Sequence, residues 1–137
     1  MSEPITGGCH CGAVRYTLSS DPLWGGHCQC TNCQKFGSGG HVSNLIGPKA
    51  AFDVSGDLAV YEYDADSGNR MTRYACPVCS TPIYGTSSAN AEGVVIRAGS
   101  LDDSSVFEAK AVIYTDSAAD WDTVDASLPT FPGMPQR

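Results

Sequence analysis

The stretch HCQCTNC, residues 27–33, places three cysteines within six residues. The seven cysteines of the chain fall into three groups: Cys9 with Cys11 in CHC, the trio Cys28, Cys30 and Cys33, and Cys76 with Cys79 in CPVC. Every cysteine lies within three residues of another, which is the spacing of metal ligands. A closed structural zinc site takes four protein ligands, so the trio raises the question of a missing fourth ligand.

Disulfide bridges are the simplest other explanation for many cysteines, and they belong mainly to small secreted chains. Here the number of cysteines is odd, and C-x-C pairs are too cramped for an easy local bridge. The N-terminal segment MSEPITGG has neither the basic region nor the apolar run of a secretory signal. We therefore expect reduced thiols in a cytoplasmic protein.

Length and composition predict a single domain over residues 1–137, with 42% apolar residues to build its core. The net charge of −7 and only eight basic residues argue against a nucleic-acid partner. No apolar run approaches the ~20 residues needed to cross a membrane. The sequence therefore predicts a soluble protein, and it gives no indication of the oligomeric state.

Short alternating or β-branched runs, separated by Gly, Pro, Asp and Ser, are typical of an all-β fold. Strands are expected over six ranges: Ala13–Leu18, His41–Ile46, Leu58–Tyr63, Arg70–Ala75, Val94–Ala98 and Ala109–Tyr114. A turn is expected at Asp64–Asn69, and short helical turns after Thr31 and around Asp116–Trp121. The tail, about residues 128–137, contains three prolines and is expected to be irregular.

The number of cysteines suggests how they divide. CPVC follows an expected strand, as in a zinc knuckle, and needs two more sulfurs, from either Cys9 and Cys11 or the trio; the spacing does not choose between them. Seven divides into a closed four-ligand site and a three-ligand site whose fourth position stays open to water or substrate. The alternative is that His10, His27 or His41 completes a second closed site. His27 is the first candidate, unless it only hydrogen-bonds to the site.

Five segments, in this order over nearly the whole chain, carry a resemblance to a known family: GGCHCGAVRY, CQCTNCQKFGSG, YACPVCSTPIYG, AGSLDD and LPTFPGMP. They resemble the glutathione-dependent formaldehyde-activating enzymes, a family that includes centromere protein V-like proteins. The resemblance implies a β-tent fold and carbon–sulfur lyase activity, which reversibly joins glutathione to formaldehyde as S-(hydroxymethyl)glutathione. The partners would then be a small thiol and a small carbonyl compound.

The resemblance also implies two Zn²⁺ sites, with glutathione as cosubstrate. The structural zinc would be held by Cys9, Cys11, Cys76 and Cys79, and the catalytic zinc by Cys28, Cys30 and Cys33. The chain has Gln29 where members often have His, and Ser80 where they often have Gly. A serine in a left-handed conformation costs on the order of 1–2 kcal/mol relative to glycine.

Three thiolates already give a Zn²⁺ centre a net charge of −1, so thiol chemistry is favoured over activation of water. Lys35, two residues after Cys33, is a candidate catalytic residue that would offset the charge of a fourth thiolate. Arg70 and Arg73 are candidates to bind the carboxylates of glutathione. The competing hypotheses are a non-catalytic, zinc-stabilised binding domain and a carrier of glutathione or formaldehyde.

Overall fold

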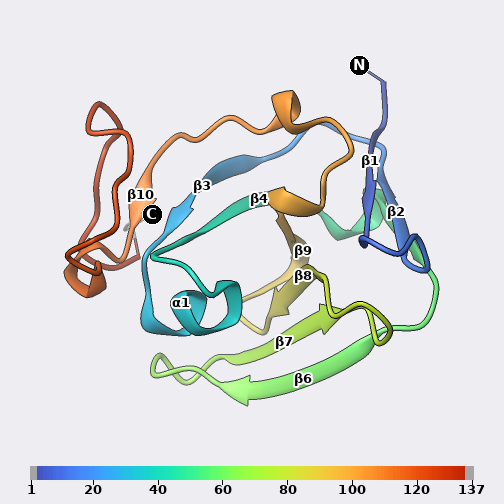
Figure 1. Cartoon of the computed structure of the whole chain (residues 1–137), viewed down its shortest axis with the longest axis horizontal. Helices are drawn as coiled ribbons and strands as arrows, with labels where there is room; N and C mark the ends of the chain where they lie inside the picture. The colour runs from blue at the N-terminus through green and yellow to red at the C-terminus, as the bar shows by residue number, and fades with distance from the viewer. Residues whose placement is uncertain (1–2, 135–137) are drawn as a thin grey trace.

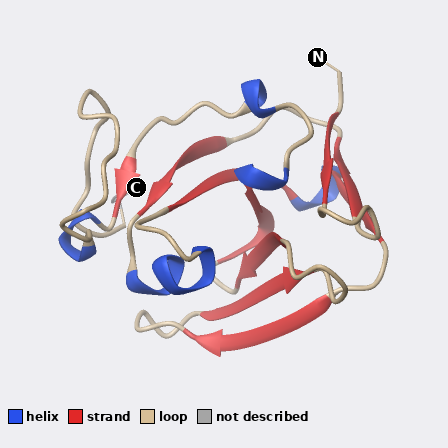
Figure 2. Cartoon of the chain, in the orientation of Figure 1, coloured by secondary structure: helices blue, strands red, loops and turns tan. Residues whose placement is uncertain are grey.

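The computed structural model describes residues 3–134 and confirms the all-β fold class, because strands dominate and α1 (Thr31–Gly37) is the one α-helix in that range. Two sheets make up the architecture (Figures 1 and 2). The larger has seven strands in the spatial order β10-β3-β4-β9-β8-β7-β6. The smaller has three, in the order β1-β2-β5.

The strands of the larger sheet are β3 (Trp24–Cys28), β4 (Val42–Pro48), β6 (Ala59–Asp64), β7 (Arg70–Ala75), β8 (Pro82–Ser87), β9 (Asn90–Arg97) and β10 (Val112–Ile113). The smaller sheet contains β1 (Ile5–Gly8), β2 (Arg15–Leu18) and β5 (Phe52–Ser55). Four 3₁₀ turns complete the regular structure: η1 (Lys49–Ala51), η2 (Ala98–Ser100), η3 (Ser104–Val106) and η4 (Thr115–Ser117).

All six expected strands exist: the one expected at Arg70–Ala75 is β7 with the same ends, and the ends of the other five are shifted. Strands β1, β3, β5 and β8 were not anticipated. Strands β1 (ITGG) and β3 (WGGHC) each contain a pair of glycines, which interrupts the alternation of apolar and polar residues that indicates a strand. The turn at Asp64–Asn69 forms with Gly68 at φ 89°. The helix expected around Asp116–Trp121 is only the 3₁₀ turn η4.

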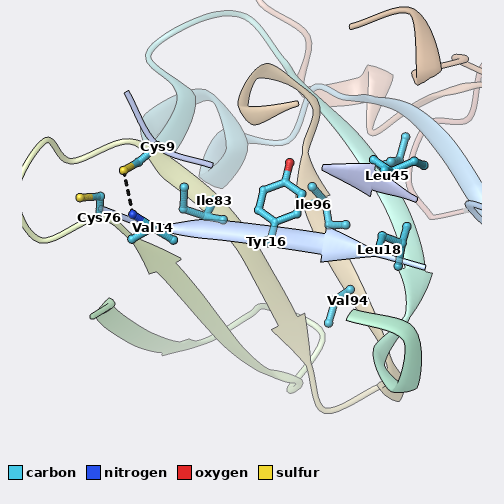
Figure 3. Packing of buried hydrophobic residues seen from close by; sticks show 10 residues of the cluster. Cys9, Val14, Tyr16, Leu18, Leu45, Cys76, Ile83, Val94 and Ile96 are labelled. Atoms are coloured by element: carbon cyan, nitrogen blue, oxygen red, sulfur yellow. Dashed lines mark hydrogen bonds between the residues drawn. The ribbon is translucent and has the colours of Figure 1, made fainter. Parts of the chain in front are cut away.

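The main core lies between the two sheets (Figure 3). Val14 and Leu18 from the segment of β2 pack with Leu45, Ile83 and Ile96 from the larger sheet, and each is at most 1% exposed. Side chains of this size each contribute roughly 1.5–3 kcal/mol when fully buried. In Figure 3 this cluster extends at one end to Cys9 and Cys76, so the fold brings two distant cysteines together at the margin of its core.

The other face of the larger sheet is defined by its register, because directly paired residues point to the same side. Cys28 pairs with Val42, Asn44 with Arg97, Val95 with Gly85, and Gly85 with Arg73. Helix α1 contributes to this side, where the Phe36 ring lies 6.0 Å from that of Tyr61 and 5.6 Å from that of Tyr63. The face therefore runs from the end of β3 to the edge strand β6.

The proline-rich tail is irregular, as expected, but it is anchored. Val112 in β10 donates a backbone hydrogen bond to Pro129 and accepts one from Phe131, both 2.9 Å. The Phe131 side chain packs against a second buried cluster that includes Cys28 and Ile113. Residues 135–137 of the predicted tail lie outside the described residues. Within residues 3–134, no helix is long and apolar enough to cross a membrane.

Candidate metal centres and the groove beside them

Four cysteines from the two sheets converge at the margin of the core. Their sulfur atoms all lie within 4.8 Å of one another, and the four are Cys9, Cys11, Cys76 and Cys79. Cys9 and Cys11 are 3.6 Å apart, and Cys11 and Cys76 are 3.7 Å apart, measured between Sγ atoms. A tetrahedral zinc with bonds of about 2.3 Å requires sulfur separations of roughly 3.8 Å. The donor set fits a closed tetrahedral metal site.

Backbone N–H groups and a hydroxyl group form hydrogen bonds with several of these sulfurs. The Val14 N–H donates to Cys9 Sγ at 3.2 Å, the interaction drawn in Figure 3, and the Val78 N–H donates to Cys76 Sγ at 3.3 Å. The hydrogen bonds of Thr81, first its hydroxyl and then its backbone, lower the pKa of Cys79 to about 5. Such N–H···S bonds are expected around a zinc knuckle, the turn that the CPVC pattern predicts.

The segment AGSLDD, residues 98–103, ties the smaller sheet to the larger one beside this site. Asp102 accepts a hydrogen bond from the Thr6 hydroxyl at 2.7 Å. It also forms a bidentate ion pair with the guanidinium of Arg15. The Arg15 guanidinium, with help from Thr6, lowers the pKa of Asp102 to about 2. Ser100 contacts the buried Tyr16 hydroxyl at 2.7 Å. These contacts hold the strands on either side of Cys9 and Cys11 in place.

The trio Cys28, Cys30 and Cys33 forms a second group, whose sulfurs also lie within 4.8 Å of one another. Cys28 ends β3, Cys30 is the N-cap of α1, and Cys33 lies in the first turn of that helix. The Cys33 N–H donates to Cys30 Sγ at 3.2 Å, so the N-terminus of α1 faces the trio. Cys28 and Cys33 are each 5% exposed, whereas Cys30 is half-buried.

The three thiols of the trio act on one another. Contacts with Cys28 and then Cys33 lower the pKa of Cys30, whereas contacts with the other two sulfurs, together with burial, raise the pKa of Cys28. One negative charge is therefore easily held at Cys30 and shared by its neighbours. Three soft sulfur donors fit Zn²⁺, and among residues 3–134 no fourth His, Cys, Asp or Glu ligand atom joins them.

The histidines lie elsewhere, so the structure lends no support to a second site closed by His10, His27 or His41. The His27 ring, on the opposite face of β3 from Cys28, bonds through Nδ1 to the Ser43 hydroxyl at 2.8 Å. It packs edge-on against His41 with ring centroids 4.8 Å apart. His27 supports the strand behind the trio.

Sequence reasoning missed the residue that holds Gln29. The Gln29 side chain, only 3% exposed, donates from Nε2 to the Asp122 carboxylate at 2.9 Å. Asp122 also contacts His41 Nδ1 at 2.9 Å, and its side chain is 8% exposed. The Gln34 amide donates to the Gln29 carbonyl at 2.8 Å. Because Asp122 lies 93 residues after Gln29, no local pattern could have linked them.

The three charged candidate residues, Lys35, Arg70 and Arg73, lie in different surroundings. Lys35 is exposed on α1 and has no hydrogen bond or ion pair within the described chain, so its catalytic role stays a prediction. Arg70 is exposed and paired with Glu62 at 2.9 Å and Asp64 at 3.1 Å. Arg73 turns to the other face of β7 and lies over the Phe36 ring, 3.8 Å from its centroid.

A groove of about 250 Å³ opens on this face, and we call it the arginine groove. Its lining includes Phe36, Tyr61, Arg73, Ser80, Tyr84 and Arg97. Phe36 is on α1 three residues after Cys33, so one helical turn connects the lining of the groove to the trio.

Comparisons with known proteins agree on the family. The family model described as glutathione-dependent formaldehyde-activating enzyme matches residues 4–117. Two curated relatives carry the name "Putative glutathione-dependent formaldehyde-activating enzyme". The protein from Halomonas elongata is 32% identical over 85 residues, which cover 58% of this chain and 54% of the relative. The protein from Emericella nidulans is 33% identical over 84 residues, which cover 56% and 40%.

The matched part is therefore about half the length of these relatives or less. Among solved structures, the crystal structure of a Rhodobacter sphaeroides protein is similar with a TM-score of 0.57 at 19% identity, covering 71% of this chain and 87% of that one. At that level of identity the likeness concerns the fold alone.

Proposed function

Because the chain belongs to the glutathione-dependent formaldehyde-activating enzyme family, we propose that it is a zinc-dependent carbon–sulfur lyase. It reversibly joins glutathione, or a similar thiol, to formaldehyde or a similar small carbonyl compound. The observation that carries the proposal is the trio Cys28, Cys30 and Cys33, three converging sulfurs with no fourth protein ligand in the described part of the chain. All seven cysteines belong to groups that could hold a metal, which favours a reducing compartment such as the cytoplasm.

The two groups of cysteines have different roles in this proposal. Cys9, Cys11, Cys76 and Cys79 hold a structural Zn²⁺, because four converging thiols close a tetrahedron. Cys28, Cys30 and Cys33 hold the catalytic Zn²⁺, which when bound supplies a Lewis acid with one exchangeable position. Cys30, the half-buried member, faces the side from which a substrate can approach.

The reaction requires few groups from the protein. The sulfur of the cosubstrate, as a thiolate, gives its electron pair to the formaldehyde carbon and forms the C–S bond. The carbonyl electron pair moves to the oxygen, which takes up a proton from solvent, and the reverse reaction breaks the same bond. The protein holds thiol and aldehyde together at the trio, and the N–H groups at the start of α1 stabilise negative charge there.

Exchange spectroscopy by NMR tests this proposal. Glutathione and formaldehyde are equilibrated, and the forward and reverse rates are measured with and without catalytic amounts of the metal-loaded protein. We expect both rates to rise by the same factor, and Cys30→Ser to abolish the increase while leaving a folded protein. Unchanged rates would refute the enzyme and favour a carrier or a binding domain.

A further inference from the structure

Arg73 and Arg97 are two cations on one face of the larger sheet that have no carboxylate partner. Within residues 3–134, ion pairs form at Arg15, Arg70 and Lys110, but not at Arg73 or Arg97. This is unexpected in a chain with 15 acidic and eight basic residues, in which carboxylates outnumber cations. Both arginines line the arginine groove, so two positive charges that no acidic side chain neutralises face the same space.

The partners of Arg73 orient its guanidinium without neutralising it. The group stacks on Phe36 and donates from one terminal nitrogen to the Tyr63 hydroxyl at 3.3 Å. Its Nε is buried and has no hydrogen-bond partner in the described structure. Stacking on an aromatic ring fixes the plane of a guanidinium, so its terminal N–H groups, rather than the buried Nε, are the ones oriented to donate to a carboxylate.

Arg97, on β9, is also oriented by a neutral partner. One of its terminal nitrogens donates to the side-chain oxygen of Asn44, a buried and neutral partner. Gly85 of β8 pairs with Arg73 on β7 and, on β9, with Val95, two residues before Arg97. A Cβ at Gly85 would meet only the Thr72 carbonyl, at 3.0 Å, so no side chain fills the floor of the sheet there.

The groove is also next to the trio. Phe36, beneath Arg73, follows Cys33 on α1, and Asn44, beside Arg97, pairs with Gly26, two residues before Cys28. A small molecule that extends from the trio along this face therefore reaches the arginines. A volume of about 250 Å³ suits the end of a small, charged cosubstrate better than a large apolar ligand.

We propose that the arginine groove binds a carboxylate of the thiol cosubstrate, with Arg73 and Arg97 as the residues that select an anionic thiol over a neutral one. This proposal rests on the proposed function, which places the sulfur of the cosubstrate at the trio. The preference for a negatively charged cosubstrate follows from the two arginines of the groove. Glutathione fits this description, because it carries two carboxylates and one thiol. A neutral thiol would reach the trio without this contact.

Binding is tested with S-methylglutathione, whose blocked sulfur cannot serve as a thiolate ligand. In calorimetric titrations of the full-length, metal-loaded protein, we expect Arg73→Gln and Arg97→Gln each to weaken binding about tenfold or more, because charge-assisted hydrogen bonds are lost. Arg73→Lys should give an intermediate loss, because charge remains without the planar fork. The control, Arg70→Gln, removes the same charge from the opposite face of β7 and should leave the affinity unchanged.

A comparison of two ligands gives the same answer without any variant. The dimethyl ester of S-methylglutathione should bind the wild-type protein at least tenfold more weakly than the free acid. Equal binding of acid and ester, or a loss in Arg70→Gln as large as that in Arg73→Gln, would overturn the inference.

The inference and the proposed function can fail separately. If the protein accelerates thiol exchange but the arginine variants bind the acid normally, the function stands and the groove is not the carboxylate site. If no exchange is accelerated but binding depends on the two arginines, the carboxylate site stands and the lyase does not.

Discussion

Gln29, which stands between Cys28 and Cys30 in the sequence, donates a hydrogen bond from its buried side-chain amide to the carboxylate of Asp122 at 2.9 Å. The segment that contains Asp122 thereby holds the loop between β3 and α1 from behind. Groups that orient metal ligands in this way commonly change metal affinity 10- to 100-fold when they are removed. The bond therefore gives the C-terminal segment a part in the metal site.

Asp122→Asn should destabilise the protein and weaken metal binding at the trio. The substitution removes the negative charge that accepts from Gln29 and lies beside His41, and it replaces one carboxylate oxygen with an NH2 group. Two charge-assisted contacts are thereby weakened, at a cost of about 1–3 kcal/mol. Metal affinity at the trio should fall about tenfold or more. Urea denaturation and competition with a chelator measure the two effects. Asp120→Asn, an exposed neutralisation two residues away, is the control; equal behaviour of the two variants would rule out the bond's role.

The two cysteine groups should differ in what they contribute to folding. Cys76→Ser should unfold the domain, because the site at the margin of the core loses a ligand and structural zinc contributes folding free energy directly. Cys30→Ser should stay folded with one metal, because serine is a good N-cap and can accept from the Cys33 N–H. Circular dichroism and metal content per chain measure both. Equal loss of structure would contradict the division into structural and catalytic sites.

Ser80 is in the left-handed conformation that its position after the knuckle predicts, with φ at 68°. Ser80→Gly should raise the free energy of unfolding by about 1 kcal/mol, because glycine adopts this conformation without strain. Ser55→Gly, at an exposed position of strand β5, is the matched control and should lower the free energy of unfolding by about 0.5–1 kcal/mol. If Ser80→Gly destabilised the protein as much as the control, the turn would not be strained.

Tyr84 makes stability depend on alkaline pH. Burial, followed by the neighbouring Tyr74, raises the pKa of Tyr84 to about 12 from 10.0. Because the pKa of Tyr84 is higher in the folded than in the unfolded state, Tyr84 contributes stability at pH values below its unfolded pKa. That contribution is lost as the pH rises from about 10 to 12. The stability of Tyr84→Phe should fall less steeply in this window. In Tyr84→Phe, ultraviolet absorbance should show one fewer tyrosine that ionises at high pH than in the wild type. If stability depended on pH identically in the two proteins, Tyr84 would not cause the loss of stability.

The sequence predicted the parts of the site that are local. Metal-ligand spacing in HCQCTNC and CPVC is visible within a few residues, and the short helix expected after Thr31 is α1. The pairing of Cys9 and Cys11 with Cys76 and Cys79 required the family resemblance, because C-x-C alone does not say which distant pair completes it. The structure brings the four together.

The remaining parts depend on tertiary register, which no local pattern carries. Lys35 was predicted as a catalytic candidate and Arg73 as a carboxylate-binding one, and only the structure shows that Arg73 lies over Phe36 of α1 whereas Lys35 is exposed. Arg97 faces Arg73 only because β8 lies between β9 and β7. A strand shifted by one residue would turn each of these side chains to the other face.

The central claim is that the trio has a metal position open to the thiol, and cobalt substitution tests it most directly. Cobalt replaces zinc in the full chain, glutathione is titrated in, and the absorption spectrum of the metal is followed in the wild type and in Cys30→Ser. The account predicts a saturable spectral change in the wild type that is absent in the variant, while the four-cysteine site contributes a constant background. A wild-type spectrum that neither glutathione nor any other small thiol changes would contradict it.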